Sequence, residues 1–328
     1  MKHAILIGLT GLALVAAAVP TKKAKSSARP AVAKSVPPAA QGVSALPETS
    51  FRRTPYVGAI AVDAQTGKVL FERNADQVAR PASVTKLMTL LLCLEDMHAY
   101  KYDVTTKVTA SVRCSQERPS CVGLRPGQTM SVDDLLMSIM VKSANDAAVL
   151  LAEHSTAKNA GREIQPGDLQ AFVLRMNKKA ESLGMTHTHY ETPNGYPPRP
   201  GSKRPFDTST ARDLVKLAKA VLRYPEVFRY TKTKLTTVTD GNGNPLKMVN
   251  HNNILVKDKQ KILNEKGESE VDGLKTGYID AGGSSIILTG KRNGKRAIVI
   301  VLGSQTSKLR DASARQLMVE ALDAIAGK

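Results

Sequence analysis

The sequence has few cysteines, no motif of a catalytic metal and, after residue 19, no long apolar run, so it lacks features that metalloproteins and membrane-spanning proteins require. It contains three cysteines, of which the pair Cys114 and Cys121 offers too few ligands for zinc, and no H-E-x-x-H pattern of a catalytic metal. After residue 19 no apolar run approaches the length of about 18 residues expected of a transmembrane helix. We therefore expect no metal, no cofactor and no membrane span in the mature chain. The pair His187 and His189 lacks the further ligands that a metal site needs.

Acidic residues are also scarce. The chain has 29 Asp and Glu against 47 Lys and Arg, a net charge of +18. Residues 1–50 hold six basic residues and one acidic residue, so +13 belongs to the remainder. No recognised nucleic-acid motif accompanies this charge. We expect no nucleic-acid partner, and either an anionic envelope polymer or simply a soluble basic surface.

The N-terminal region reads as an export segment followed by a linker. Residues 1–19 combine a short basic start, an apolar run and a small-residue end, which predicts a signal peptide; an uncleaved anchor is the alternative. Residues 20–50 are rich in Ala, Pro, Ser and Lys and predict a flexible tether. Residues 51–328 are long enough for one large domain or two lobes sharing a site.

The hydrophobic periodicity predicts strands at both ends of this domain and helices in its middle. We expect strands over 56–62 and 68–72, and a hairpin over 284–302 with Asn293-Gly294 at its turn. Helices are expected from about 83, over 132–141 after a capping-box serine, from 146, and over 168–183, 209–223 and 311–326. The sequence therefore predicts a sheet lobe with an inserted helical lobe.

An S-x-x-K pattern occurs twice, and its context separates the two copies. Ser155 and Lys158 lie in a polar stretch where a helix runs out. Ser83 and Lys86 instead follow Arg80-Pro81-Ala82 and open an apolar run, which predicts a buried helix that starts near the serine. Such a position suits a developing oxyanion. A lysine one turn later, pressed against an apolar core, can lose its proton and act as a base.

Two further patterns follow in order, Ser143-Ala144-Asn145 and Lys275-Thr276-Gly277. Each alone is compatible with a purely structural role, as a helix break with capping side chains or as a strand-to-turn step. Together with Ser83 and Lys86 they supply a nucleophile, a base, a proton relay and a carboxylate clamp. These are the groups that acyl transfer needs without histidine or metal.

The three motifs resemble those of the penicillin-binding proteins and serine β-lactamases. With their flanks, they are most similar to the low-molecular-mass D-alanyl-D-alanine carboxypeptidases, and the similarity spans about residues 52–326. This resemblance implies a β-lactamase/DD-peptidase-like α/β fold, with an antiparallel sheet flanked by helices and an inserted all-helical lobe. It also implies peptidoglycan stem peptides as substrates and β-lactam antibiotics as covalent inhibitors.

The resemblance assigns catalytic roles to four residues. Ser83 would attack the carbonyl of the penultimate D-Ala, and Lys86 would take the serine proton. Ser143 would relay a proton towards the leaving amine, and Asn145 would hold the substrate amide and orient Lys86.

It assigns substrate binding to a second group. Lys275 and Thr276 would bind the terminal carboxylate, and Gly277 would let the substrate backbone lie against the strand. The N–H groups of Ser83 and Tyr278 would form the oxyanion hole. Arg310 falls where the family carries an arginine near the substrate carboxylate.

Other functions stay open at this stage. The sequence continues for 51 residues after Gly277, so we expect neither the second domain nor the C-terminal anchor of larger relatives, and a D,D-endopeptidase stays an alternative. A β-lactamase is disfavoured because Glu191 to Asn194 is one residue short of E-x-x-x-N. A non-catalytic wall-binding protein would use the basic surface and the tether.

The three cysteines divide into two groups. Cys93 lies inside the predicted apolar helix, and this position predicts that its thiol is buried and free. Cys114 and Cys121 flank a polar loop, and in an oxidising compartment we expect them to form a disulfide.

Overall fold

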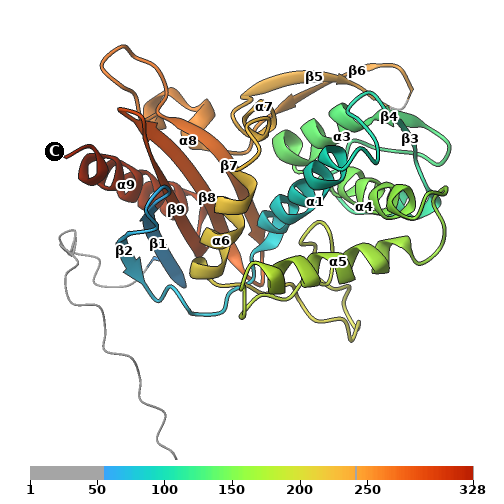
Figure 1. Cartoon of the computed structure of the whole chain (residues 1–328), viewed down its shortest axis with the longest axis horizontal. Helices are drawn as coiled ribbons and strands as arrows, with labels where there is room; N and C mark the ends of the chain where they lie inside the picture. The colour runs from blue at the N-terminus through green and yellow to red at the C-terminus, as the bar shows by residue number, and fades with distance from the viewer. Residues whose placement is uncertain (1–54, 241, 328) are drawn as a thin grey trace, which may run out of the picture. The chain divides into compact units, whose positions relative to one another are not determined.

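The computed structural model describes residues 55–240 and 242–327. The predicted signal peptide and tether lie outside the described residues. Strands from both ends of this region form one antiparallel five-stranded sheet, in the order β2–β1–β9–β8–β7 (Figure 1). Its strands are β1 (Gly58–Asp63), β2 (Val69–Arg73), β7 (Val271–Ile279), β8 (Gly283–Arg292) and β9 (Lys295–Ser304). This confirms the predicted sheet lobe.

The sheet is covered by helices on both faces, as Figure 1 shows. Helix α9 (Ser307–Ala326) packs against β8 and β9, and α6 (Ala211–Val221) packs against β1 and β9 from the other side. Alternate side chains of a strand point to opposite faces, so Val299 enters the core under α9 and Ile300 enters the core shared with the helical lobe. The central strands are accordingly almost continuously apolar.

The inserted segment forms the predicted helical lobe around α1 (Lys86–His98), which is buried nearly all round. Ser131 caps the next helix by accepting a hydrogen bond from the Asp134 N–H, as the capping-box pattern predicts. The helices and helical turns of this region are α2 (Val112–Ser115), α3 (Val132–Met137), the π-turn η2 (Ser138–Lys142), α4 (Asn145–Asn159), α5 (Asp168–Ser182) and α7 (Val227–Thr231).

Two predicted helix starts are displaced, each for a local reason. The helix expected at Ser83 begins at Lys86, because Ala82 has a positive φ of 52° and residues Ala82–Thr85 form a 3-10 turn, η1. Helix α9 begins four residues earlier than predicted, because the Thr306 side chain caps it by accepting from the Leu309 N–H.

Several short elements have no signal in the sequence. They pair only with each other or last one turn, so their hydrophobic pattern is too brief to recognise. They are α2, α7, the hairpin β3 (Lys107–Thr109) and β4 (Thr129–Ser131), the hairpin β5 (Leu235–Thr239) and β6 (Pro245–Val249), α8 (Asn253–Val256) and η3 (Asp258–Gln260).

The predicted disulfide between Cys114 and Cys121 is wrong, because both are free thiols. The Cys114 Sγ is buried and donates to the Ser111 carbonyl at 3.2 Å, whereas the Cys121 Sγ donates to the Arg118 carbonyl at 3.2 Å. The two sulfur atoms are thus turned to different backbone acceptors. Cys93 is a buried free thiol, as predicted.

Candidate active site

The first motif places an amine directly beside a hydroxyl. Ser83 lies half-buried in η1, and Lys86 opens α1 one turn later with a fully buried side chain. The Lys86 Nζ lies 2.9 Å from the Ser83 Oγ. The predicted nucleophile and base are therefore within hydrogen-bonding distance.

The other partners of Lys86 define how its hydrogens are used. Its Nζ donates to the Asn145 Oδ1 at 2.7 Å and to the backbone carbonyl of Asn194 at 2.8 Å. Both partner atoms are acceptors only. A neutral amine has two N–H bonds and one lone pair, so these two bonds leave the lone pair for the Ser83 hydroxyl hydrogen. In that protonation state Ser83 donates and Lys86 accepts.

The surroundings favour that neutral form. Burial, followed by the positive charge of Lys275, holds the pKa of Lys86 well below its usual value. The negative charges of Glu117 and Asp207 oppose this shift. Burial and the charge of Arg310 in turn lower the pKa of Lys275 to about 7.

The second motif lies at a break between helices. Ser143 follows η2 with a left-handed backbone (φ 61°, ψ 34°), and Asn145 begins α4. Asn145 is held by the loop after α2, because its N–H and its Nδ2 donate to the carbonyls of Ser120 (2.7 Å) and Arg118 (2.8 Å). Asp146 anchors the same loop by accepting three backbone N–H groups, those of residues 122–124.

The third motif reaches the same place from the sheet. Lys275 lies on β7 and is 2% exposed. Its Nζ donates to the Ser143 Oγ at 3.0 Å and to the Thr276 carbonyl at 2.9 Å. Arg310 lies in the first turn of α9, where it is buried and ion-paired with Asp311 at 2.6 Å.

Gly277 is required by packing. A Cβ at this position would lie 2.6 Å from the Pro81 carbonyl oxygen and 3.1 Å from the Ser83 nitrogen. The missing side chain thus lets β7 lie directly against the turn that carries Ser83. The contact with the substrate backbone that the resemblance implies for Gly277 stays a prediction.

These residues border one cleft of about 690 Å³. Lys86 and Lys275 lie beneath its surface. The predicted site residues that line it are Ser83, Ser143, Asn145, Thr276, Gly277, Tyr278 and Arg310. The Tyr278 side chain is 59% exposed and donates to Asp280 at 2.6 Å, so its hydroxyl is turned away from the Ser83–Lys86 pair.

Two residues support the site although the sequence predicted no role for either in it. Asn194 supplies a carbonyl to Lys86, and Asp207 accepts from Thr85 (2.9 Å) and Thr192 (3.1 Å) beneath the Ser83 turn. Burial raises the pKa of Asp207 to about 6. The Asn194-Gly195 dipeptide is a turn signal that could have drawn attention to this loop.

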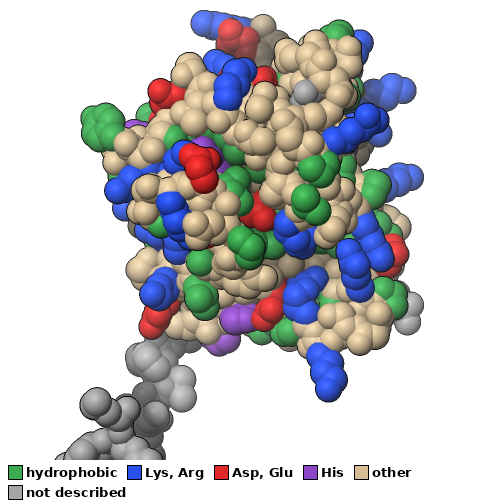
Figure 2. All heavy atoms as spheres, turned by 90° about the vertical axis from the view of Figure 1, so that its right-hand side faces the viewer, with side chains coloured by type: hydrophobic (Ala, Val, Ile, Leu, Met, Phe, Trp, Pro, Cys, Tyr) green, Lys and Arg blue, Asp and Glu red, His purple; other side chains and the backbone are tan. Residues whose placement is uncertain are grey.

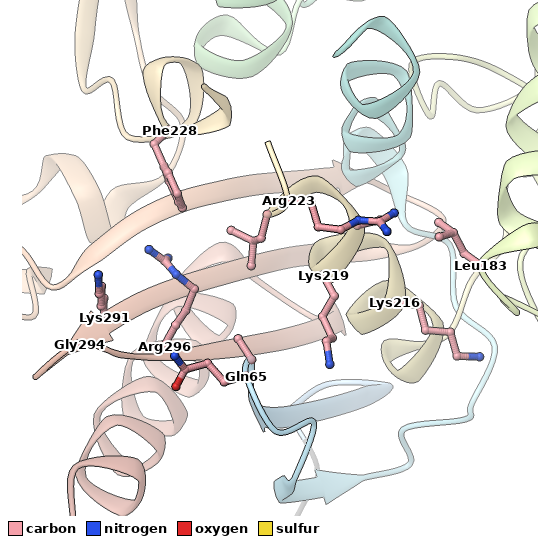
Figure 3. A pocket seen from close by; sticks show the side chains of 12 residues that line it. Gln65, Leu183, Lys216, Lys219, Arg223, Phe228, Lys291, Gly294 and Arg296 are labelled. Atoms are coloured by element: carbon pink, nitrogen blue, oxygen red, sulfur yellow. The ribbon is translucent and has the colours of Figure 1, made fainter. Parts of the chain in front are cut away.

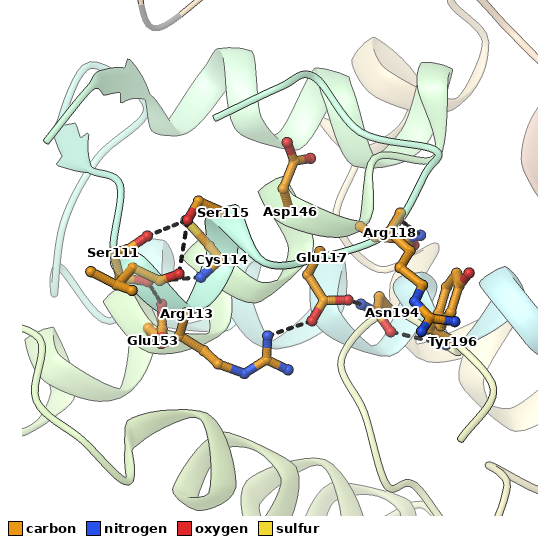
Figure 4. A network of polar contacts seen from close by, with 12 residues as sticks. Ser111, Arg113, Cys114, Ser115, Glu117, Arg118, Asp146, Glu153, Asn194 and Tyr196 are labelled. Carbon is orange, nitrogen blue, oxygen red and sulfur yellow. Dashed lines mark hydrogen bonds and ion pairs between the residues drawn. The ribbon is translucent and has the colours of Figure 1, made fainter. Parts of the chain in front are cut away.

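Figure 4 shows a polar network that continues from Asn194. The Glu117 carboxylate accepts from the Asn194 Nδ2 at 2.9 Å and pairs with Arg113 at 2.6 Å. Glu191, considered above for a β-lactamase role, pairs with His189 at 2.8 Å and borders a separate hollow.

Another hollow, of about 590 Å³, contains none of the predicted site residues. Basic side chains of α6 and of the β8–β9 hairpin border it, among them Lys219 and Arg296 (Figure 3). The second S-x-x-K copy is also separate from the cleft. Ser155 is buried against Asp96 and Arg175, and Lys158 pairs with Glu163.

The fold and this motif set are typical of the penicillin-binding class of serine peptidases. The sequence matches the D-alanyl-D-alanine carboxypeptidase family, peptidase family S11, over residues 57–306. The chain belongs to this family.

Individual relatives agree with that assignment. The D-alanyl-D-alanine carboxypeptidase DacF of Bacillus subtilis is 30% identical over 260 residues, covering 79% of this chain and 60% of that protein. DacC of Escherichia coli is 31% identical over 266 residues, covering 79% and 59%. The chain thus spans about three fifths of the length of these relatives.

Solved structures share the fold. Penicillin-binding protein D2 from Listeria monocytogenes, in its ampicillin-bound form, superposes with a TM-score of 0.65 at 29% identity. The match covers 81% of this chain and 97% of the Listeria chain. Among the residues described for our protein, no helix has the length and apolar composition needed to cross a membrane.

Proposed function

We propose that this chain is an exported serine D-Ala-D-Ala carboxypeptidase that acts on peptidoglycan stem peptides. The observation that carries the proposal is the buried Lys86 amine, 2.9 Å from the Ser83 Oγ and otherwise bonded only to acceptors. A lysine in this setting can accept the serine proton without histidine or metal.

Acylation then uses the residues of the first two motifs. The Ser83 Oγ attacks the carbonyl carbon of the penultimate D-Ala while Lys86 takes the hydroxyl proton. The N–H groups of Ser83 and Tyr278 stabilise the oxyanion. When the C–N bond breaks, Ser143 relays the proton held by Lys86 to the leaving amine, which departs as D-Ala and leaves Lys86 neutral. Water then cleaves the acyl-enzyme, with Lys86 again accepting the proton.

Lys275, Thr276 and Arg310 bind the substrate's terminal carboxylate in this mechanism. Lys275 and Arg310 are buried cations at one side of the cleft, where an anion gains more from them than it would in water. Asn145 orients Lys86 through its Oδ1 and binds the substrate amide.

Location and inhibition follow from the same proposal. The N-terminal 19 residues favour export to the periplasm or another extracytoplasmic compartment of the cell envelope. The ampicillin-bound Listeria relative supports acylation of Ser83 by β-lactams. A D,D-endopeptidase would use the same chemistry with a different leaving amine, and a wall-binding protein would not need Ser83.

The test is covalent labelling by a fluorescent penicillin, with release of D-Ala from an acyl-D-Ala-D-Ala peptide measured alongside. The wild type should be labelled and active, and Ser83→Ala should lose both. Ser83 makes no capping hydrogen bond, so the free energy of unfolding of this variant should change by less than about 1 kcal/mol. Labelling or hydrolysis that persists in folded Ser83→Ala would contradict the mechanism.

A further inference from the structure

The cleft holds more positive charge than the proposed mechanism uses. Among its described lining residues there is no Asp or Glu. Beyond Arg310, three lysines line it: Lys142, Lys247 and Lys257. Within residues 55–240 and 242–327, none of their ammonium groups has a hydrogen-bond or ion-pair partner. Figure 2 shows that Lys and Arg also outnumber acidic side chains on the helical face of the molecule.

The three lysines come from neighbouring elements of one wall. Lys142 ends η2 directly before Ser143, and Lys247 lies on β6, which packs beside η2. Lys257 directly follows α8, on the segment that continues from β6. Lys142 is half-buried, whereas Lys247 and Lys257 are exposed to the cleft.

The surroundings of His251 show that this wall lies near Lys275 and Arg310. Its pKa is lowered to about 4 by burial and then by the charges of Lys275, Lys142, Lys86 and Arg310. Burial is the largest of these causes, and the charges of Lys275 and Lys142 follow it. Lys142 thus faces the same imidazole as the Lys275–Arg310 pair.

The carboxylate bound by that pair belongs to the residue that leaves. In the proposed function it is the C-terminal carboxylate of the substrate, so cations beside Lys275 and Arg310 lie on the leaving-group side. A D-Ala leaving group has one carboxylate, and the clamp already binds it. The remaining lysines have no anion to meet in that substrate.

We propose that Lys142, Lys247 and Lys257 form a second anion subsite, which selects leaving groups that carry a further carboxylate. The inference rests on the proposed function and narrows its substrate class. The subsite accepts an acidic C-terminal residue, or a released peptide with carboxylates of its own. Complementary charge in a cleft without opposing acids speeds association and stabilises the bound substrate.

The test uses two peptides that differ by one charge, acyl-D-Ala-D-Glu and acyl-D-Ala-D-Gln. Their leaving residues have nearly the same size and the same backbone carboxylate. We expect the wild type to have a kcat/KM about fivefold higher for the D-Glu peptide at low ionic strength, with the ratio falling as salt is added. Release of D-Glu or D-Gln is measured by chromatography.

Matched variants assign the effect to the cleft. Lys142→Gln combined with Lys247→Gln should bring the ratio close to one, and Lys142→Arg with Lys247→Arg should retain it. Lys178→Gln with Lys219→Gln removes the same charge from exposed positions outside the cleft and should leave the ratio unchanged. Stoichiometric penicillin labelling confirms that each variant is folded.

Three results would overturn the inference. One is a wild-type ratio within twofold of unity, and another is a ratio that persists in the cleft glutamine variant. The third is an equal loss in the Lys178–Lys219 control, since the net charge of the protein would then be the cause. In each case release of D-Ala from acyl-D-Ala-D-Ala would still support the proposed function. Failure of that release, together with absent labelling, overturns both.

Discussion

The Lys275 Nζ lies 3.0 Å from the Ser143 Oγ, although 132 residues separate them in the chain. This contact joins β7 of the sheet lobe to the end of η2 in the helical lobe. The candidate site therefore exists only when both lobes are packed, because each lobe supplies groups that the other lacks.

Titration of Lys275 should appear in the pH profile. Its pKa of about 7 means that the amine is charged below pH 7 and loses its charge above it. The kcat/KM for acyl-D-Ala-D-Ala, which reports the free enzyme, should fall about tenfold per pH unit above this value. Lys275→Arg should remove this basic limb, since arginine stays charged. If kcat/KM of Lys275→Arg still fell above pH 7, a group other than Lys275 would be responsible for the basic limb.

Gly195 should tolerate no side chain. It has φ +75°, and a Cβ there would lie 1.9 Å from the Ala82 carbonyl oxygen, directly beside Ser83. Gly195→Ala should lower the free energy of unfolding by about 3 kcal/mol or more and abolish penicillin labelling. Gly201→Ala is the matched control, because φ is +78° but nothing lies within 4 Å. Its cost should be only about 1 kcal/mol, measured by urea denaturation.

His154 should make stability depend on mildly acidic pH. Burial lowers its pKa to about 4 from an ordinary 6.5, and its Nε2 has no hydrogen-bond partner among the residues that the structure describes. The unfolded chain therefore binds the proton more readily between these values, so the free energy of unfolding should rise as pH increases from 4 to 6.5. Denaturation of His154→Leu should show a shallower rise across this interval. An identical slope would exclude His154 as a contributor.

The cysteines should react as three separate thiols. Cys93 and Cys114 are buried, and Cys121 is only partly so. Brief alkylation of the native protein should label Cys121 first, and slowly, because burial raises the pKa of its thiol to about 11. A reducing agent should leave the melting temperature unchanged. A mass two units lower, with no alkylation of Cys114 or Cys121, would show that they are paired.

The local sequence was sufficient to predict the long helices and strands. The Asn293-Gly294 turn joins β8 and β9 as predicted, with positive φ at both residues, because that dipeptide favours the twist of a tight hairpin. The apolar run after Lys86 gave the buried helix for a similarly local reason. The start of α1 was missed, since the positive φ of Ala82 has no counterpart in side-chain type.

The features of the candidate site also divide into those that the sequence determined and those that only the tertiary structure decided. The order and spacing of Ser83-x-x-Lys86, Ser143-x-Asn145 and Lys275-Thr276-Gly277 determined by themselves which residues meet and which family the chain belongs to. Only the tertiary structure decided that Lys86 donates to the Asn194 carbonyl, that Glu117 bonds to Asn194 across 77 residues, and that the cysteines stay free. These contacts join polar loops distant in sequence, where no hydrophobic period exists and the partner is chosen by the packing of the two lobes.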